Sequence, residues 1–287
     1  MSEAGGIFAF VQLEFGFLLG PADGRYLLRL APDAPPHRVV VLTTLGAPER
    51  RALRGRRPVS VTEGAPEPVP TSRITLIDPE PFPGPAAAGA WLAGVRGQRE
   101  RADAHVEAAV LAANAALRAH RAAVADPFAR DISAEQALVV RLGYGNGNTV
   151  ADGRYAEAVE LPRASRTRPR RSMEAPDERF AALMGAREPL LVCEELVLRA
   201  RADLLAARGR EAALQARVAL ESLLSELHAD LPDERRGQLQ ADRGPVGDAA
   251  NAALSGPLGE ARQAAVEAAV ERMEAALRAR RLRSARD

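Results

Sequence analysis

The spacing of the apolar residues changes once along this chain of 287 residues, and the change limits the folds open to it. In residues 7–19 every odd position is apolar, although Phe8, Phe10 and Leu18 place apolar side chains on the other face as well. Alternation with period two is typical of a β-strand that buries one face. Beyond residue 86 the apolar positions recur at steps of three and four, which is typical of amphipathic helices. The chain is therefore expected to begin with strands and to continue with helices.

Turn residues follow the first strand, since positions 20–24 read Gly-Pro-Ala-Asp-Gly. Residues 25–30 then alternate in part, so the two segments together predict a β-hairpin. Two further strand candidates follow, at residues 39–45 and 73–78. Between them lies a long loop rich in Pro, Gly and Arg, residues 46–70, with an optional short strand at 59–62. These segments predict a small antiparallel sheet of three to five strands.

Pro81, Pro83 and Pro85 fall within five residues and mark the change from strands to helices. Clustered prolines lack backbone N–H donors and are typical of a boundary or a stiff linker. We accordingly divide the chain into a β-rich N-terminal part, residues 1–82, and a larger, mainly α-helical part, residues 83–287. The alternative is one continuous domain with the sheet packed on the helices. In both cases the predicted fold class is α+β.

Helical spacing predicts several helices after this boundary. The first covers residues 86–125, with the glycines at 94–97 as a candidate break, and His120 on its apolar stripe is expected to make a half-buried contact. Ser133 and Gln136 have the spacing of a capping box, which predicts a helix from 133 to about 142. The remaining predictions are a short helix at 176–184, loops at 162–172 and 231–246, and a final helix at 257–283.

The longest helical pattern spans residues 189–229 and has Gly209 on its apolar stripe. Glycine costs a helix about 1 kcal/mol relative to alanine, but it also lets another helix approach closely. We therefore predict one continuous helix with a close crossing at Gly209, and a break at that residue is the alternative. A stripe of this length can pair with a second copy, as in a coiled coil. The stripe consists of Leu191, Leu198, Ala202, Leu205, Gly209, Ala212, Ala216, Ala219, Leu223 and Leu227.

All 39 basic residues are Arg, and the absence of Lys removes several mechanisms. A Schiff-base lysine, a P-loop lysine and the strand lysine of kinases are excluded. Because pyridoxal phosphate enzymes need a Schiff-base lysine, they are excluded as well. Cys193 is the only cysteine, so an intramolecular disulfide, a Cys-rich zinc site and an ordinary iron–sulfur site are excluded as well. No two of the four histidines lie within four residues of each other. We predict no cofactor and no metal site, and we assign no catalytic residue.

The longest apolar stretch, residues 7–19, contains Gln12 and Glu14. It is shorter than the ~20 residues that cross a membrane as a helix, so no membrane span is predicted. The N-terminal residues lack the basic start of a signal peptide. Together with the single cysteine, these features predict a cytoplasmic location.

A glycine-rich segment contains Gly143, Gly145 and Gly147, and Arg141 and Arg154 flank it. Backbone N–H groups of such a segment can approach an anion, next to the positive start of a following helix. Phosphate loops of the dinucleotide type follow a strand, however, whereas this segment is expected to follow a helix. The segment is therefore either a ligand loop for a nucleotide or phosphate, or a flexible turn between helices, and we favour the turn.

Three short segments, residues 50–57, 162–171 and 278–286, each hold five Arg and no acid. They account for 15 of the 39 basic residues, so that 24 Arg face 38 acidic residues in the rest of the chain. Guanidinium binds phosphate through paired hydrogen bonds, and Arg-rich segments therefore suit nucleic acid or another polyanion. An acidic protein surface is an equally suitable partner. The anion-binding candidates are Arg163, Arg166, Arg168, Arg170 and Arg171.

These observations support three hypotheses of function. The first is a non-enzymatic cytoplasmic interaction or scaffold protein that oligomerises through the long Ala- and Leu-rich helix. The second is a module that binds nucleic acid or another polyanion through the Arg segments. The third is a nucleotide- or phosphate-binding protein, or an enzyme, that uses residues 143–147. We prefer the first, because the helix length and the charge segregation support it and no catalytic set is evident in the sequence.

Overall fold

The computed structural model describes residues 6–46, 70–162 and 176–284. Most of the two predicted loops at 46–70 and 162–172, together with the optional strand at 59–62, therefore lie outside the described residues.

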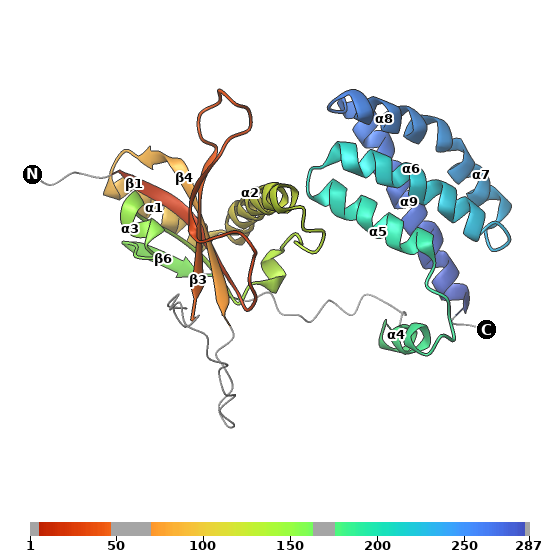
Figure 1. The fold of residues 1–287 in the computed structure, drawn as a ribbon, viewed down its shortest axis with the longest axis horizontal. Coiled ribbons are helices and arrows are strands. Elements are labelled where there is room, and N and C mark those ends of the chain that lie inside the picture. The colour runs from red at the N-terminus through yellow and green to blue at the C-terminus, as the bar shows by residue number, and fades with distance from the viewer. Residues whose placement is uncertain (1–5, 47–69, 163–175, 285–287) are drawn as a thin grey trace, which may run out of the picture. The chain divides into compact units, whose positions relative to one another are not determined.

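The chain divides into two compact units, Met1–Thr167 and Arg168–Asp287, and each is described by itself (Figure 1). The division does not fall at residue 82, where the residue composition changes. Three α-helices and two strands that follow residue 82 belong to the first unit, because they pack on or pair with the N-terminal strands.

The described residues of the first unit form a single antiparallel sheet, which together with the helices confirms the predicted α+β class (Figure 1). Its six strands are β1 (Ile7–Phe15), β2 (Gly24–Leu28), β3 (Arg38–Leu45), β4 (Thr71–Phe82), β5 (Val139–Asn146) and β6 (Glu157–Glu160). Their order across the sheet is β2-β3-β4-β1-β5-β6. The four strands predicted in the first 80 residues are confirmed, and the sheet is larger than predicted because β5 and β6 join it.

The predicted hairpin between the first two strands is wrong. β1 pairs with β4 on one side and with β5 on the other, so that Leu13 lies opposite both Ile74 and Val140. β2 pairs with β3 instead and forms an edge of the sheet. The apolar residues on both faces of β1 suit the centre of a sheet, whereas β2 is mostly exposed.

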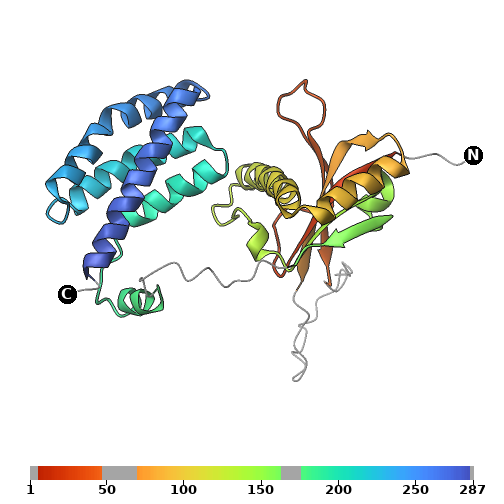
Figure 2. The ribbon, with the colours of Figure 1, turned by 180° about the vertical axis from the view of Figure 1, so that it is seen from behind.

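Two helices, α1 (Pro85–Gly97) and α2 (Arg99–Val124), cover one face of the sheet (Figure 2). The extended backbone of Gln98 separates them, which confirms a break next to the predicted glycines. Odd-numbered residues of β1, such as Leu13, pack in one core with α2 residues such as Ala113. His120, towards the end of α2, is half-buried as predicted.

The predicted helix from 133 to about 142 is wrong beyond its first turn. Ser133 and Gln136 form the predicted capping box, but it opens only a 3₁₀ turn, Ala134–Gln136. The β-branched residues at 139 and 140 favour a strand instead, and pairing of β5 with β1 buries Leu142 completely. A short helix, α3 (Gly147–Ala151), then connects β5 to β6.

The described residues of the second unit form six helices (Figure 1). They are α4 (Pro176–Met184), α5 (Val192–Leu205), α6 (Gly209–Glu226), α7 (Asp233–Ala241), α8 (Arg243–Ser255) and α9 (Glu260–Ser284). The helices predicted at 176–184 and 257–283 are confirmed, whereas the predicted loop at 231–246 is wrong because α7 and α8 form there. Within the described parts of both units, no helix is long and apolar enough to cross a membrane.

The predicted continuous helix at 189–229 is wrong, and the alternative, a break near Gly209, is confirmed. α5 ends at Leu205, Ala207 has a left-handed φ of 54°, and α6 begins at Gly209. The two helices pack on each other as a hairpin. The second half of the predicted stripe is consequently buried inside the unit, at Ala212, Ala216, Ala219, Leu223 and Leu227.

Candidate functional site

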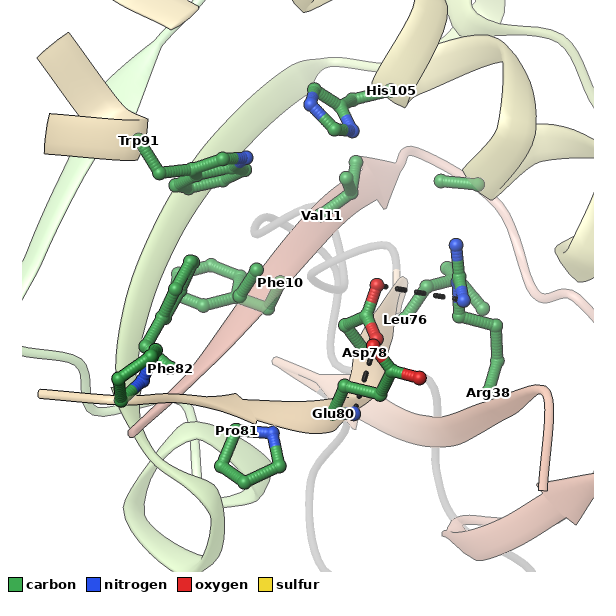
Figure 3. Close-up of a pocket in the computed structure, with 13 residues that line it drawn as sticks. Phe10, Val11, Arg38, Leu76, Asp78, Glu80, Pro81, Phe82, Trp91 and His105 are labelled. Atoms are coloured by element: carbon green, nitrogen blue, oxygen red, sulfur yellow. Dashed lines mark hydrogen bonds and ion pairs between the residues drawn. The ribbon is translucent and has the colours of Figure 1, made fainter. Parts of the chain in front are cut away.

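A cavity of about 280 Å³ lies between the sheet and the helices α1 and α2 (Figure 3). A bulge in β4 helps to shape it: Phe8 pairs with Pro81 and Phe10 pairs with Ile77, so residues 78–80 of β4 lie opposite the single residue Ala9. Bulges redirect side chains and are common next to binding sites. The cavity is lined by Ala9, Phe10, Val11, Arg38, Leu76, Asp78, Glu80, Pro81, Phe82, Pro83, Trp91, His105 and Ala109.

Aromatic side chains form one side of the cavity. Trp91 of α1 and Phe82 of β4 lie with their ring centroids 5.7 Å apart, and the rings are tilted by 48°. On the other side of the indole, the His105 ring of α2 meets Trp91 in an edge-on arrangement, 5.4 Å between centroids. Trp91 therefore contacts both the sheet and the second helix at this site.

Charged side chains lie across from the aromatic side (Figure 3). Arg38 Nη1 is 3.6 Å from Asp78 Oδ2, a loose ion pair, and Asp78 Oδ1 accepts a hydrogen bond of 3.2 Å from the backbone N–H of Glu80. Glu80 is exposed, and none of the described residues forms an ion pair with its carboxylate. The cavity thus has one arginine and two carboxylates at its polar end.

Burial lowers the pKa of His105 below its ordinary value of 6.5, because desolvation penalises the charged imidazolium. The positive charges of Arg101 and Arg38 lower the pKa further, and Asp78 opposes them in part. His105 is therefore neutral at pH 7, with one ring nitrogen that donates and one that accepts hydrogen bonds.

The arrangement is suited to binding. Among its described lining residues there is no Ser, Thr or Cys to act as a nucleophile. Nor does the described part of the chain bring together three His, Cys, Asp or Glu side chains in a way that could hold a metal ion. The cavity offers a small molecule an aromatic side, a neutral imidazole and a charged rim.

The glycine-rich segment is neither a helix–helix turn nor a phosphate loop after a helix. Gly143 and Gly145 lie inside β5, opposite Phe10 and Phe8 of β1, and Gly147 is the first residue of α3. A Cβ atom on Gly143 would lie 2.5 Å from the Glu157 carbonyl oxygen. These two strand glycines allow close packing of β5 with its neighbours.

The arginines that flank this segment do not converge on it. Arg141 donates a hydrogen bond to Gln12 and is 3.1 Å from Glu160, on the sheet face away from α1 and α2. Arg154 is 76% exposed and is 3.7 Å from Asp152. Of the five ligand-loop candidates, only Gly147 lines a described hollow, of about 440 Å³, and the Arg25 guanidinium there already binds Asp152 and Asn148. Among the described residues, the hollow therefore has no free cation for a phosphate.

The Arg segments are only partly described. Arg163, Arg166, Arg168, Arg170 and Arg171 lie outside the described residues, as does the segment 50–57. In the third segment each described side chain has an acidic neighbour in its own unit. These pairs are Arg278 with Glu274 at 4.0 Å, Arg280 with Asp230 at 3.3 Å and Arg281 with Glu194 at 3.7 Å.

A second candidate site is an apolar stripe on the outer face of α5, which we call the α5 outer stripe. Val192, Leu198 and Leu205 are 60%, 64% and 72% exposed, and Glu195 and Ala202 lie between them on the same face. The predicted stripe assigned Leu198, Ala202 and Leu205 to a contact face. Inside the unit, however, α5 buries Cys193, Val197 and Ala200 instead.

Comparison of the chain with protein-family models, curated proteins and solved structures found no match. Two features of the described residues remain as functional candidates, the cavity of the first unit and the α5 outer stripe of the second. They belong to different units and can be tested separately.

Proposed function

We propose that this chain is a non-enzymatic interaction protein that associates with a second copy of itself through the α5 outer stripe. One observation carries the proposal: the outer side of α5 leaves three large apolar side chains 60–72% exposed, whereas α4 and α6 each expose two, Phe180 with Met184 and Leu214 with Val218. Contiguous exposed apolar patches in soluble proteins typically mark interaction sites.

The residue order along the stripe favours a second copy as the partner. If two α5 helices cross antiparallel about a two-fold axis near Leu198, Val192 of one copy faces Leu205 of the other. Glu195 then faces the small side chain of Ala202, and the two Leu198 side chains meet near the axis. An interface of this kind uses the same patch on both subunits and closes at a dimer.

Charges on the same face are compatible with this pairing. Glu195 and Arg199 form an exposed ion pair of 3.0 Å within α5. In the antiparallel arrangement each of them can instead pair with the opposite charge of the second copy, so no charge is left without a partner. Because only three large apolar side chains per copy contribute, the interface is small, and we expect weak, concentration-dependent association.

The proposal moves the contact from the whole predicted helix to its first half, since α6 is buried within its own unit. A cytoplasmic location is part of the proposal and rests on the single cysteine. Binding of nucleic acid through the segment 162–171 stays a prediction from the sequence, because those side chains lie outside the described residues.

Sedimentation velocity of the full chain over a range of concentrations tests the proposal. We expect a monomer–dimer equilibrium in the wild type and a monomer at all concentrations in Leu198→Asp. Leu254→Asp is the matched control, because Leu254 lies on α8 of the same unit and is 68% exposed, and it should dimerise like the wild type. Circular dichroism checks that both variants are folded.

A wild-type chain that stays monomeric throughout would overturn the proposal. So would a dimer that Leu198→Asp leaves unchanged, or one that Leu254→Asp disrupts to the same extent.

A further inference from the structure

We infer that the cavity between the sheet and helices α1 and α2 binds a small organic cation, an amine or ammonium group on an apolar and preferably aromatic body. The inference concerns the first unit and is independent of the self-association proposed for the second. It rests on the size of the cavity, its aromatic side and the charges at its rim.

The size of the cavity limits the ligand. At about 280 Å³ it is slightly below the ~300–1,000 Å³ of most small-molecule pockets. It equals the liquid volume of about nine water molecules at ~30 Å³ each. A single aromatic ring with a short side chain fits this volume, whereas a nucleotide does not.

The aromatic side favours a cation over a neutral group. Trp91 and Phe82 present ring surfaces to the same space (Figure 3). Aromatic faces carry a negative quadrupole and attract cations, and indole is the strongest of the aromatic side chains in this respect. The same rings contribute apolar contact to the body of the ligand.

The rim supplies the negative charge. Among the lining residues, Asp78 and Glu80 provide two carboxylates against the single guanidinium of Arg38, and His105 is neutral at pH 7, so the lining carries one negative charge in excess. Arg101 also acts on His105, but it does not line the cavity. Asp78 is engaged by Arg38, and Glu80 therefore has the carboxylate most available to an ammonium group. An anionic ligand would meet this excess charge and bind less well.

The chain contains one tryptophan, so its fluorescence reports on this cavity alone. The test is a fluorescence titration of the full chain at pH 7.5 with three probes of equal shape: 2-phenylethylammonium, neutral 2-phenylethanol and anionic phenylacetate. We expect a saturable change with the ammonium, binding about tenfold weaker for the alcohol, which corresponds to ~1.4 kcal/mol, and weaker binding still for the carboxylate.

Two variants locate the charge that matters. Glu80→Gln keeps the shape of the side chain and should weaken binding of the ammonium probe about threefold to fivefold, as expected for a partly solvated ion pair. The binding of the neutral alcohol should not change. Glu107→Gln is the matched control: Glu107 is exposed on α2 and does not line the cavity, so this variant should bind all three probes like the wild type.

The inference is overturned if no ammonium probe gives a saturable change at millimolar concentration. It is also overturned if the alcohol or the carboxylate binds as tightly as the ammonium, or if Glu80→Gln and Glu107→Gln have the same effect. None of these outcomes bears on dimerisation, which is measured separately.

Discussion

The Trp91 indole and the His105 imidazole meet edge-on with their ring centroids 5.4 Å apart, and they join α1 to α2 above the sheet. Burial and the nearby charges of Arg101 and Arg38 lower the pKa of His105, while Asp78 raises it in part. The neutral imidazole and the only indole of the chain are therefore neighbours at pH 7.

The fluorescence of Trp91 should depend on the protonation of His105. An imidazolium next to an indole quenches its emission more strongly than a neutral imidazole, so the intensity should fall as the pH is lowered. Because the pKa of His105 is lowered, we expect the midpoint below 6.5. His105→Asn should remove the transition, and a midpoint at or above 6.5, or one that survives the substitution, contradicts the assignment.

The same shift should make the stability of the first unit depend on pH. In the unfolded chain His105 binds a proton as the pH falls through about 6.5, whereas in the folded chain it stays neutral until a lower pH. The free energy of unfolding should therefore decrease as the pH falls from 7 through the folded pKa, with the full loss below it. Urea unfolding at several pH values gives the free energy of unfolding of wild type and of His105→Asn. The carboxylates contribute equally to both pH profiles, so the difference between the two profiles is the contribution of His105. Parallel profiles would argue against this contribution.

Apolar spacing was sufficient to predict those elements whose own residues decide their structure. The first strand and the final helix were predicted correctly, because one face of each is apolar at the right period. Residues 139–142 were predicted wrongly as helix, since a capping box precedes them and their short apolar run fits both structures. Pairing with β1 decides the outcome there, and that contact spans more than 120 residues of chain.

Gly143 of β5 packs so closely against β6 that a larger side chain has no room there. A Cβ atom at this position would lie 2.5 Å from the Glu157 carbonyl oxygen and 2.6 Å from Ala158 Cβ. Gly143→Ala should therefore destabilise the fold by about 1–3 kcal/mol, the usual cost of overpacking. Gly97→Ala, at the end of α1, has nothing within 4 Å of the added atom and should be close to neutral. Equal unfolding free energies in the two variants, from urea titrations, would exclude this role.

The cavity could not be predicted, because its residues are unremarkable in sequence and come from separate elements. Asp78, Trp91 and His105 lie in β4, α1 and α2, and the packing of both helices on the sheet brings them together. The α5 outer stripe is a different case. Leu198 and Leu205 do fit an apolar period, but α5 carries a second set of apolar residues, which includes Cys193 and Val197. Packing on α6 and α9 buries this second set, and the sequence does not show which of the two sets is buried.

Asp242 and Arg272 join the α7–α8 junction to α9 through two hydrogen bonds to one carboxylate. The Asp242 side chain is 9% exposed and the Arg272 side chain is 43% exposed, so solvent screens part of the interaction. We expect Asp242→Ala to destabilise the second unit by about 1–2 kcal/mol, less than the cost of breaking a fully buried pair. Glu221→Ala removes the pair between Glu221 and Arg243, at 2.6 Å and about half exposed, and should cost under ~1 kcal/mol. Thermal unfolding of both variants measures the two losses of stability. A larger loss for Glu221→Ala than for Asp242→Ala would contradict the prediction.

Cys193, the only thiol, should be unreactive in the folded chain. It is fully buried in α5, and burial, followed by its side-chain hydrogen bond with Glu226 and the negative charges of Glu226 and Glu194, raises its pKa to about 12. At pH 8 a thiol of ordinary pKa is about one quarter thiolate, so the raised pKa alone should slow reaction with a disulfide reagent roughly a thousandfold. Folded protein should therefore release almost no colour with such a reagent, while protein in guanidinium chloride should titrate one thiol per chain at once. Glu226→Gln should lower the pKa and speed the native reaction; equal rates for folded and unfolded wild type would show that Cys193 is accessible.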